Sequence, residues 1–193
     1  SLLHPSTFLF FLWEPFVALK NVILFQLFIN LLGMYLLGIK LKLSQISAIV
    51  SASVYGFSSS LVIYTNNLPM LGVAVLLPWG VWALIKYINK QNRINFLILV
   101  LILTFQIFAG YPQFIFFSWL FYLAYLFYIA KNNLKSKLVS LVSILILVSL
   151  LVSVQMLPFL ELAVNSTSIN RGFDYATFGS FNPLLLIKFA AAR

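Results

Sequence analysis

Eight of the 12 lysines and arginines of this 193-residue chain lie in three clusters, and long apolar runs separate each cluster from the next. The clusters are Lys40 with Lys42, then Lys86, Lys90 and Arg93, then Lys131, Lys135 and Lys137. The three acids, Glu14, Glu161 and Asp174, lie outside all of them. Lys and Arg are retained on the cytoplasmic side when a polytopic protein inserts. The pattern therefore predicts three cytoplasmic loops, with both chain ends on the other side of the membrane.

The composition agrees with lipid as the solvent. The chain is 63% hydrophobic and only 8% charged, whereas soluble domains carry about 25% charged residues. The formal net charge of +9 does not indicate nucleic-acid binding, because the basic residues stand in loops between apolar spans and build no continuous stripe. Anionic lipid headgroups are the expected partners of these loops.

Several kinds of chemistry are excluded by residue type. The chain has no cysteine and one histidine, His4, so a thiolate nucleophile and a metal site built from Cys or His clusters are ruled out. No carboxylate pair stands at metal-ligand spacing, so the sequence indicates no cofactor and gives no support for a divalent ion. No charged residue stands mid-span, which counts against a proton-coupled transporter, a pump or a voltage sensor.

The apolar runs predict an all-α transmembrane bundle. About 20 residues of helix cross a bilayer core, and six segments reach this length: 21–39, 45–64, 68–86, 94–110, 113–130 and 138–160. Residues 7–18 are apolar but short and contain Glu14-Pro15, so they are expected to form an interfacial helix on the outer face. Residues 161–182 are the predicted outer loop, and a further apolar segment begins in 183–193. We expect residues 1–193 to be one transmembrane domain and a fragment of a larger one.

Features within the spans predict helix contacts. Small residues recur every fourth position at Ala48, Ala52, Gly56 and Ser60, which is typical of a face that packs closely on another helix. Pro78 predicts a bend in its span, because proline removes one helical hydrogen bond. The few polar residues inside spans are expected to make interhelical hydrogen bonds: Gln26, Asn30, Gln106 and Gln155.

The candidate functional residues gather at the predicted outer face. Gln113 follows the turn at 110–112 although a turn does not require it, and Gln155 and Glu161 stand near the end of the last span. Glu161 has two interpretations, a surface acid or a carboxylate that faces a cavity. Arg171 likewise is either a solvated loop charge, a partner of an acid, or a phosphate ligand.

Short motifs in a fixed order carry a family resemblance. They are Leu3-His4-Pro5, Tyr55-Gly56-Phe57-Ser58, Leu77-Pro78-Trp79, Ile107 to Gln113, Gln155-x-x-Pro158-x-x-Glu161, Arg171 in a polar loop, and Ser180-Phe181-Asn182-Pro183. In this order they resemble the bacterial YfhO-type membrane proteins across nearly the whole chain. The match departs at Tyr111, where the family often has histidine.

The resemblance implies membership of the GT-C glycosyltransferase superfamily. Such an enzyme sits in the bacterial cytoplasmic membrane and moves a sugar from a polyprenyl-phosphate carrier to a cell-envelope acceptor on the outer face. The superfamily places its key acid in the first large outer loop, near whose end this chain is expected to begin. The catalytic residue is then unknown here, with Glu161 as a candidate, and Tyr111, Gln113, Gln155 and Arg171 are the candidate substrate-binding residues.

Two other classes of function stay open. A transporter or lipid-handling protein without group transfer is the main alternative, and it predicts internal repeats and broken helices near the midplane. A structural partner in an envelope complex is the third. The sequence has one proline-broken span and no convincing repeat.

Overall fold

A computed structural model describes residues 3–129 and 134–166, and every regular element in these ranges is helical. The elements are η1 (Pro5–Phe11, a 3-10 helix), α1 (Pro15–Lys40), α2 (Gln45–Gly56), α3 (Ser59–Tyr64), α4 (Leu68–Asn89), α5 (Arg93–Phe108), α6 (Pro112–Ile129) and α7 (Leu134–Val164). The chain divides into two compact units, Ser1–Gln155 and Met156–Arg193.

Four helices are long and apolar enough to cross a membrane, namely α1, α4, α6 and residues 141–162 of α7. Large apolar side chains are exposed along these helices, for example Phe16, Phe28 and Phe116. Exposed apolar surface on this scale is expected where lipid is the solvent. The structure thus indicates a membrane protein, as the composition predicts.

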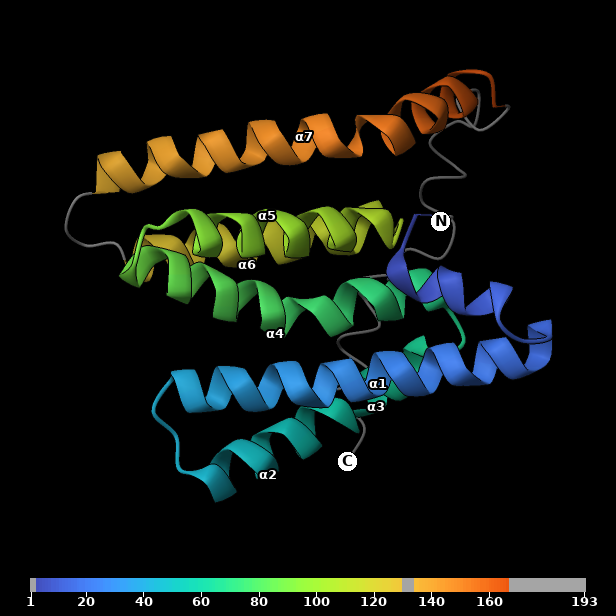
Figure 1. Cartoon of the computed structure of the whole chain (residues 1–193), viewed down its shortest axis with the longest axis horizontal. Coiled ribbons are helices and arrows are strands. Elements are labelled where there is room, and N and C mark those ends of the chain that lie inside the picture. Colours follow the sequence, from blue (N-terminus) through green and yellow to red (C-terminus); the bar gives the residue numbers. More distant parts are fainter. Residues whose placement is uncertain (1–2, 130–133, 167–193) are drawn as a thin grey trace, which may run out of the picture. The chain divides into compact units, whose positions relative to one another are not determined.

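Two of the six predicted spans differ from the others. The segment 45–64 is not one helix, because the chain leaves the helical conformation at Phe57 and Ser58, between α2 and α3. Helices α2 and α3 run in the same direction (Figure 1). The chain therefore still crosses from the loop after α1 to the turn before α4, as one span would. The segment 94–110 appears as α5 with 16 residues, about 24 Å at 1.5 Å per residue. That these two segments cross the membrane remains a prediction.

The expected interfacial helix at 7–18 is also wrong in its bounds. Helix η1 ends at Phe11, and α1 begins at Pro15. Proline lacks a backbone N–H and has a fixed φ, so it suits the first position of a helix and not an interior one. Glu14-Pro15 therefore starts the long helix, and η1 packs against α1.

Local capping explains where the helices begin. The side chain of Ser44 accepts a hydrogen bond from the Ser47 N–H at the start of α2, and Asn67 accepts one from the Met70 N–H at the start of α4. Asn92 does the same for Asn95 at the start of α5, at 2.8 Å. Each cap satisfies an N–H that has no partner within its own helix.

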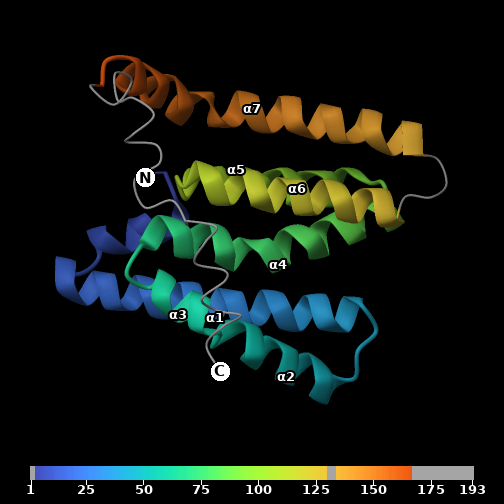
Figure 2. The ribbon, with the colours of Figure 1, turned by 180° about the vertical axis from the view of Figure 1, so that it is seen from behind.

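Small residues bring α1, α2 and α4 together. Ala48, Ala52 and Gly56 are buried, and a Cβ built at Gly56 would overlap the side chain of Leu31 on α1. The predicted contact face is thus confirmed for these three residues, whereas Ser60, which follows the helix break, is exposed. Helix α4 continues through Pro78 and is bent in both ribbon views (Figures 1 and 2).

The alternating helix directions collect the turns at two ends of the first unit. Lys40, Lys86 and Arg93 lie at the end where α1 and α4 finish and α5 begins, and the turns at 65–67 and 109–111 lie at the other (Figure 1). The basic residues of these loops therefore share one end, as the charge pattern predicts.

Labelling of single cysteines tests the orientation of these ends. The chain has no natural cysteine, and Asn66 and Asn89 are both exposed near opposite ends of α4. We expect Asn66→Cys to react with an impermeant thiol reagent in intact cells and Asn89→Cys to react only after permeabilisation. Labelling of Asn89→Cys alone in intact cells would reverse the predicted orientation. Asn66 is preferred to Asn67 because Asn67 caps α4.

Candidate functional site

Tyr111 and Gln113 stand where α5 turns into α6. Gly110 has φ 85°, a left-handed conformation that glycine adopts without steric cost, and it reverses the chain. The Tyr111 ring packs edge-on against Phe114 with centroids 5.2 Å apart. Gln113 is exposed in the first turn of α6, where its amide can meet a ligand.

The other predicted site residues lie on α7 and beyond it. Gln155 is half-buried at the end of the first compact unit. Glu161 is exposed, and its backbone carbonyl accepts a hydrogen bond from the Asn165 N–H at 3.1 Å. Arg171, like most of the predicted outer loop 161–182 and the segment 183–193, lies outside the described residues. The convergence of Gln113, Gln155, Glu161 and Arg171 on one site therefore stays a prediction.

A buried polar cluster joins η1 to α1. The Nδ1 atom of His4 lies 2.7 Å from the Ser6 Oγ, and the Gln26 Nε2 donates to the same oxygen at 3.0 Å. Ser6 and Gln26 are each 4% exposed. Gln26 was expected to bond between helices, and its bond to η1 comes from a segment 20 residues away. The sequence analysis did not anticipate this cluster, and its only trace in the sequence is the pair of polar residues His4 and Ser6 in front of an apolar span that contains a glutamine.

The cluster is uncharged at neutral pH. Burial of the imidazole lowers the pKa of His4 to about 4, because a desolvated cation is disfavoured. The Ser6 hydroxyl accepts from Gln26, and it donates to the Nδ1 of His4 when the imidazole hydrogen is on Nε2. In that tautomer Nε2 is a free donor.

Two cavities flank the cluster. One has a volume of about 210 Å³ and is lined by the cluster together with residues of η1, α1, α4 and the end of α5: Thr7, Phe10, Val22, Leu68, Pro69 and Ala109. The other, of about 200 Å³, extends from the cluster along apolar side chains: Phe25, Ile29, Val75, Leu76 and Phe105. The Oε1 atom of Gln26 is buried without a hydrogen-bond partner.

Gly72 allows this close assembly. A Cβ at this position would lie 3.0 Å from the Ala109 Cβ and 3.5 Å from the His4 Nε2. The glycine thus lets α4 approach both the end of α5 and the start of η1. It brings the motif segment at residues 3–5 next to the one at residues 107–113.

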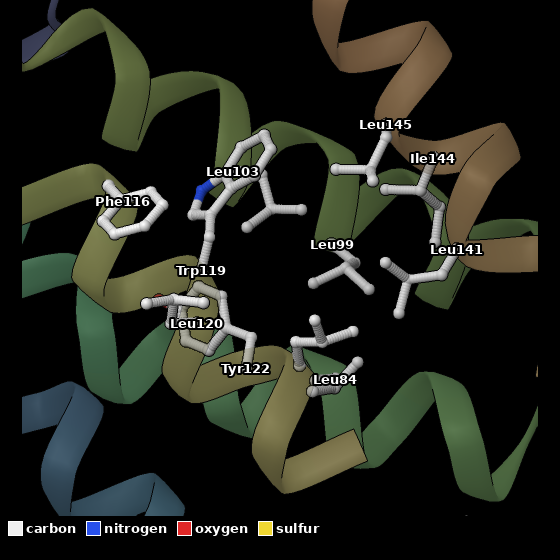
Figure 3. A pocket seen from close by; sticks show the side chains of 11 residues that line it. Leu84, Leu99, Leu103, Phe116, Trp119, Leu120, Tyr122, Leu141, Ile144 and Leu145 are labelled. Carbon is white, nitrogen blue, oxygen red and sulfur yellow. The ribbon is translucent and has the colours of Figure 1, made fainter. Parts of the chain in front are cut away.

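A third cavity is almost wholly apolar. It has a volume of about 250 Å³ between α4, α5, α6 and α7, and Figure 3 shows aliphatic and aromatic side chains around it, among them Leu99, Leu103 and Ile144. The indole nitrogen of Trp119 is buried at this site without a hydrogen-bond partner. Such a lining suits a hydrocarbon chain.

A second buried polar contact lies between α4, α5 and α6. Gln106 donates to the Val73 carbonyl at 3.3 Å and to the Tyr122 hydroxyl at 3.2 Å. The Tyr122 hydroxyl also lies 3.4 Å from the Leu77 carbonyl. The expected interhelical role of Gln106 is confirmed.

Within residues 3–129 and 134–166, no group of three His, Cys, Asp or Glu side chains is placed to hold a metal ion. Comparison with models of protein families, with curated proteins and with solved structures finds no match. The candidate site therefore rests on the geometry of this chain, with the polar cluster at His4, Ser6 and Gln26 as its best-defined part.

Proposed function

We propose that this chain is part of a membrane glycosyltransferase of the YfhO type, within the GT-C superfamily. It moves a sugar from a polyprenyl-phosphate carrier to a cell-envelope acceptor on the outer face of the bacterial cytoplasmic membrane. The observation that carries the proposal is a shared cavity. His4 and Ala109 belong to two motifs that resemble the family, lie 105 positions apart in the sequence, and both line the cavity of about 210 Å³.

The arrangement of charges supports an outward-facing site. This cavity lies at the end of the bundle that holds the turns 65–67 and 109–111, opposite Lys86, Lys90 and Arg93 (Figure 1). With the basic loops in the cytoplasm, the cavity faces the outer side, where a lipid-linked sugar is used.

The proposed reaction is an inverting transfer. The acceptor hydroxyl oxygen forms a bond to the anomeric carbon of the sugar, and the bond from that carbon to the phosphate oxygen breaks. The polyprenyl phosphate leaves with the electron pair, and the hydroxyl proton passes to a carboxylate. The resemblance assigns this carboxylate to the first large outer loop of the superfamily. Glu161 is a secondary acid, Arg171 contacts the phosphate, and Tyr111, Gln113 and Gln155 contact the sugar.

Transfer assays with the full-length protein test the proposal. With a labelled sugar on polyprenyl phosphate, Arg171→Ala should raise the KM for the donor about tenfold or more, because a charge-assisted hydrogen bond contributes about 1.5 to 3 kcal/mol. Arg93→Ala, at the start of α5 in a predicted cytoplasmic loop, is the matched control and should leave the KM unchanged. Glu161→Gln should lower transfer less than loss of the acid in the first large outer loop. Unchanged transfer in both site variants, at normal protein levels, would remove these residues from the site.

One observation is equally compatible with the alternative, a lipid-handling protein without group transfer. The apolar cavity between α4 and α7 (Figure 3) can take a lipid chain whether or not a sugar is moved. Purified protein in liposomes distinguishes the two functions. Accelerated movement of a labelled lipid between leaflets, with no sugar transfer from any polyprenyl-phosphate donor, would select the alternative.

A further inference from the structure

We propose that the cavity of about 200 Å³ beside Gln26 binds the hydroxyl headgroup of an uncharged membrane lipid. The lipid's hydrocarbon chain lies along the apolar wall that α1, α4 and α5 form. That this lipid is the sugar acceptor rests on the proposed function. The binding itself follows from three properties of the described cavity wall: a glutamine whose side-chain oxygen has no hydrogen-bond partner, no charged side chain among the described lining residues, and an apolar surface that reaches the outside of α1.

The acceptor is the Oε1 atom of Gln26. The side chain is 4% exposed, its Nε2 is bound to Ser6, and its Oε1 has no hydrogen-bond partner in the described structure. A buried acceptor without a donor destabilises the folded protein. The ligand must therefore donate a hydrogen bond, which a hydroxyl does and an ester or ether oxygen does not. The Nε2 of His4, which also lines this cavity, can donate to the same hydroxyl oxygen.

The lining excludes charged headgroups. Among residues 3–129 and 134–166, no Asp, Glu, Lys or Arg side chain lines either cavity beside the cluster. A phosphate in this place would lose its hydration without gaining a counter-charge, and burial of an unpaired ion is strongly unfavourable. An uncharged alcohol such as diacylglycerol meets no such penalty.

The apolar wall gives the lipid chain its place. Phe25, Ile29, Val75, Leu76 and Phe105 extend the cavity away from the polar cluster. Phe25 is 45% exposed, so this wall continues to the outer surface of α1, where membrane lipid is available. A lipid chain is already out of water in the bilayer, so its move into this apolar wall gains little from the hydrophobic effect. Specificity must then come from the hydroxyl.

Photo-crosslinking tests the inference in the full-length protein, reconstituted in nanodiscs. The probe is a diacylglycerol with a diazirine in one acyl chain. We expect saturable labelling of peptides from α1 and α4, competition by unlabelled dioleoylglycerol, and no competition by dioleoylphosphatidylglycerol at the same concentration. Gln26→Leu should reduce the apparent affinity about tenfold, which corresponds to about 1.4 kcal/mol.

Two further variants keep the test decisive. Leu76→Trp fills the apolar wall without changing the polar cluster, so it should abolish saturable labelling. This variant provides the test if Gln26→Leu fails to fold. Gln91→Leu makes the same substitution as Gln26→Leu at an exposed residue and should leave labelling unchanged. Equal competition by phosphatidylglycerol, full labelling of a folded Gln26→Leu variant, or no saturable labelling, as expected if only water fills the cavity, would each overturn the inference.

Sugar transfer is measured separately from binding. Saturable diacylglycerol binding with no sugar transferred to any acceptor would reject the transferase and keep the lipid site. Transfer to another acceptor without diacylglycerol binding would reject the lipid site and keep the transferase.

Discussion

Replacing Gly80 with Leu is expected to lower the free energy of unfolding by about 2 to 5 kcal/mol, the combined cost of overpacking and of a lost polar contact. A Cβ at Gly80 would overlap the hydroxyl end of the Tyr122 ring and lie 2.9 Å from its Cε1. Tyr122 is 7% exposed and has little room to move. Its displacement would break the hydrogen bond with Gln106, which is completely buried. The better helix propensity of Leu offsets only about 1 kcal/mol.

Unfolding in mixed micelles, followed by tryptophan fluorescence, measures this effect. Ala124→Leu is the matched control, because Ala124 is an exposed small residue on the same helix as Tyr122, and we expect it to change stability by less than about 0.5 kcal/mol. Combining Gly80→Ala with Tyr122→Phe should cost less than the sum of the two single changes, since the second removes the clashing oxygen. Equal stability of the Gly80→Leu and Ala124→Leu variants would show that α4 and α6 do not meet here.

The expected change has the opposite sign at Asn30, where substitution by Leu should raise the free energy of unfolding by about 1 to 3 kcal/mol. Asn30 is completely buried in α1, and neither its Oδ1 nor its Nδ2 has a hydrogen-bond partner in the described structure. Leu has the same branching at Cγ, so it fills a similar space without polar atoms. Replacing an unsatisfied amide by an apolar group of the same shape removes a desolvation cost.

Asn95→Leu is the control for this second prediction. Asn95 is also buried, but its Nδ2 donates to the carbonyls of Lys90 at 2.8 Å and Lys86 at 3.3 Å. Its replacement should lower the free energy of unfolding by about 1 to 2 kcal/mol. The same micelle assay compares both variants. If Asn30→Leu lowered the free energy of unfolding as much as Asn95→Leu does, Asn30 would have a polar partner, such as an ordered water molecule, in the folded protein.

The sequence was informative about the helices because two of its patterns are physical requirements of a bilayer. Basic residues mark the loops that stay in the cytoplasm, and in the structure Lys40, Lys86 and Arg93 share one end of the first unit. Small residues at every fourth position mark close helix contacts, and Ala48 and Ala52 are buried as expected. Both patterns depend only on neighbours along the chain.

Other features depend on tertiary contacts and left little trace in the sequence. The break between α2 and α3 coincides with Gly56 and the run Ser58-Ser59-Ser60, but the apolar residues on either side allowed residues 45–64 to be taken as one span. The cluster of His4, Ser6 and Gln26 requires η1 to fold back on α1, and no local pattern specifies that fold. The site at Gln113 and Gln155 was predicted from the order of the family-like motifs along the chain. That order indicates a resemblance but says nothing about the distance between the two side chains.

Three glycine contacts share one geometry, in which a side chain from a neighbouring helix occupies the space of the missing Cβ: Trp79 at Gly33, Leu31 at Gly56 and Tyr122 at Gly80. Lipid competes equally well for ordinary apolar surface, so these interlocked pairs define which helices are neighbours. Most lipid-facing residues can then be replaced by other apolar residues independently of one another, whereas each of these glycines can be replaced only if its partner changes as well. Covariation between these three pairs of positions is thus the signature by which a distant relative of this bundle can be recognised.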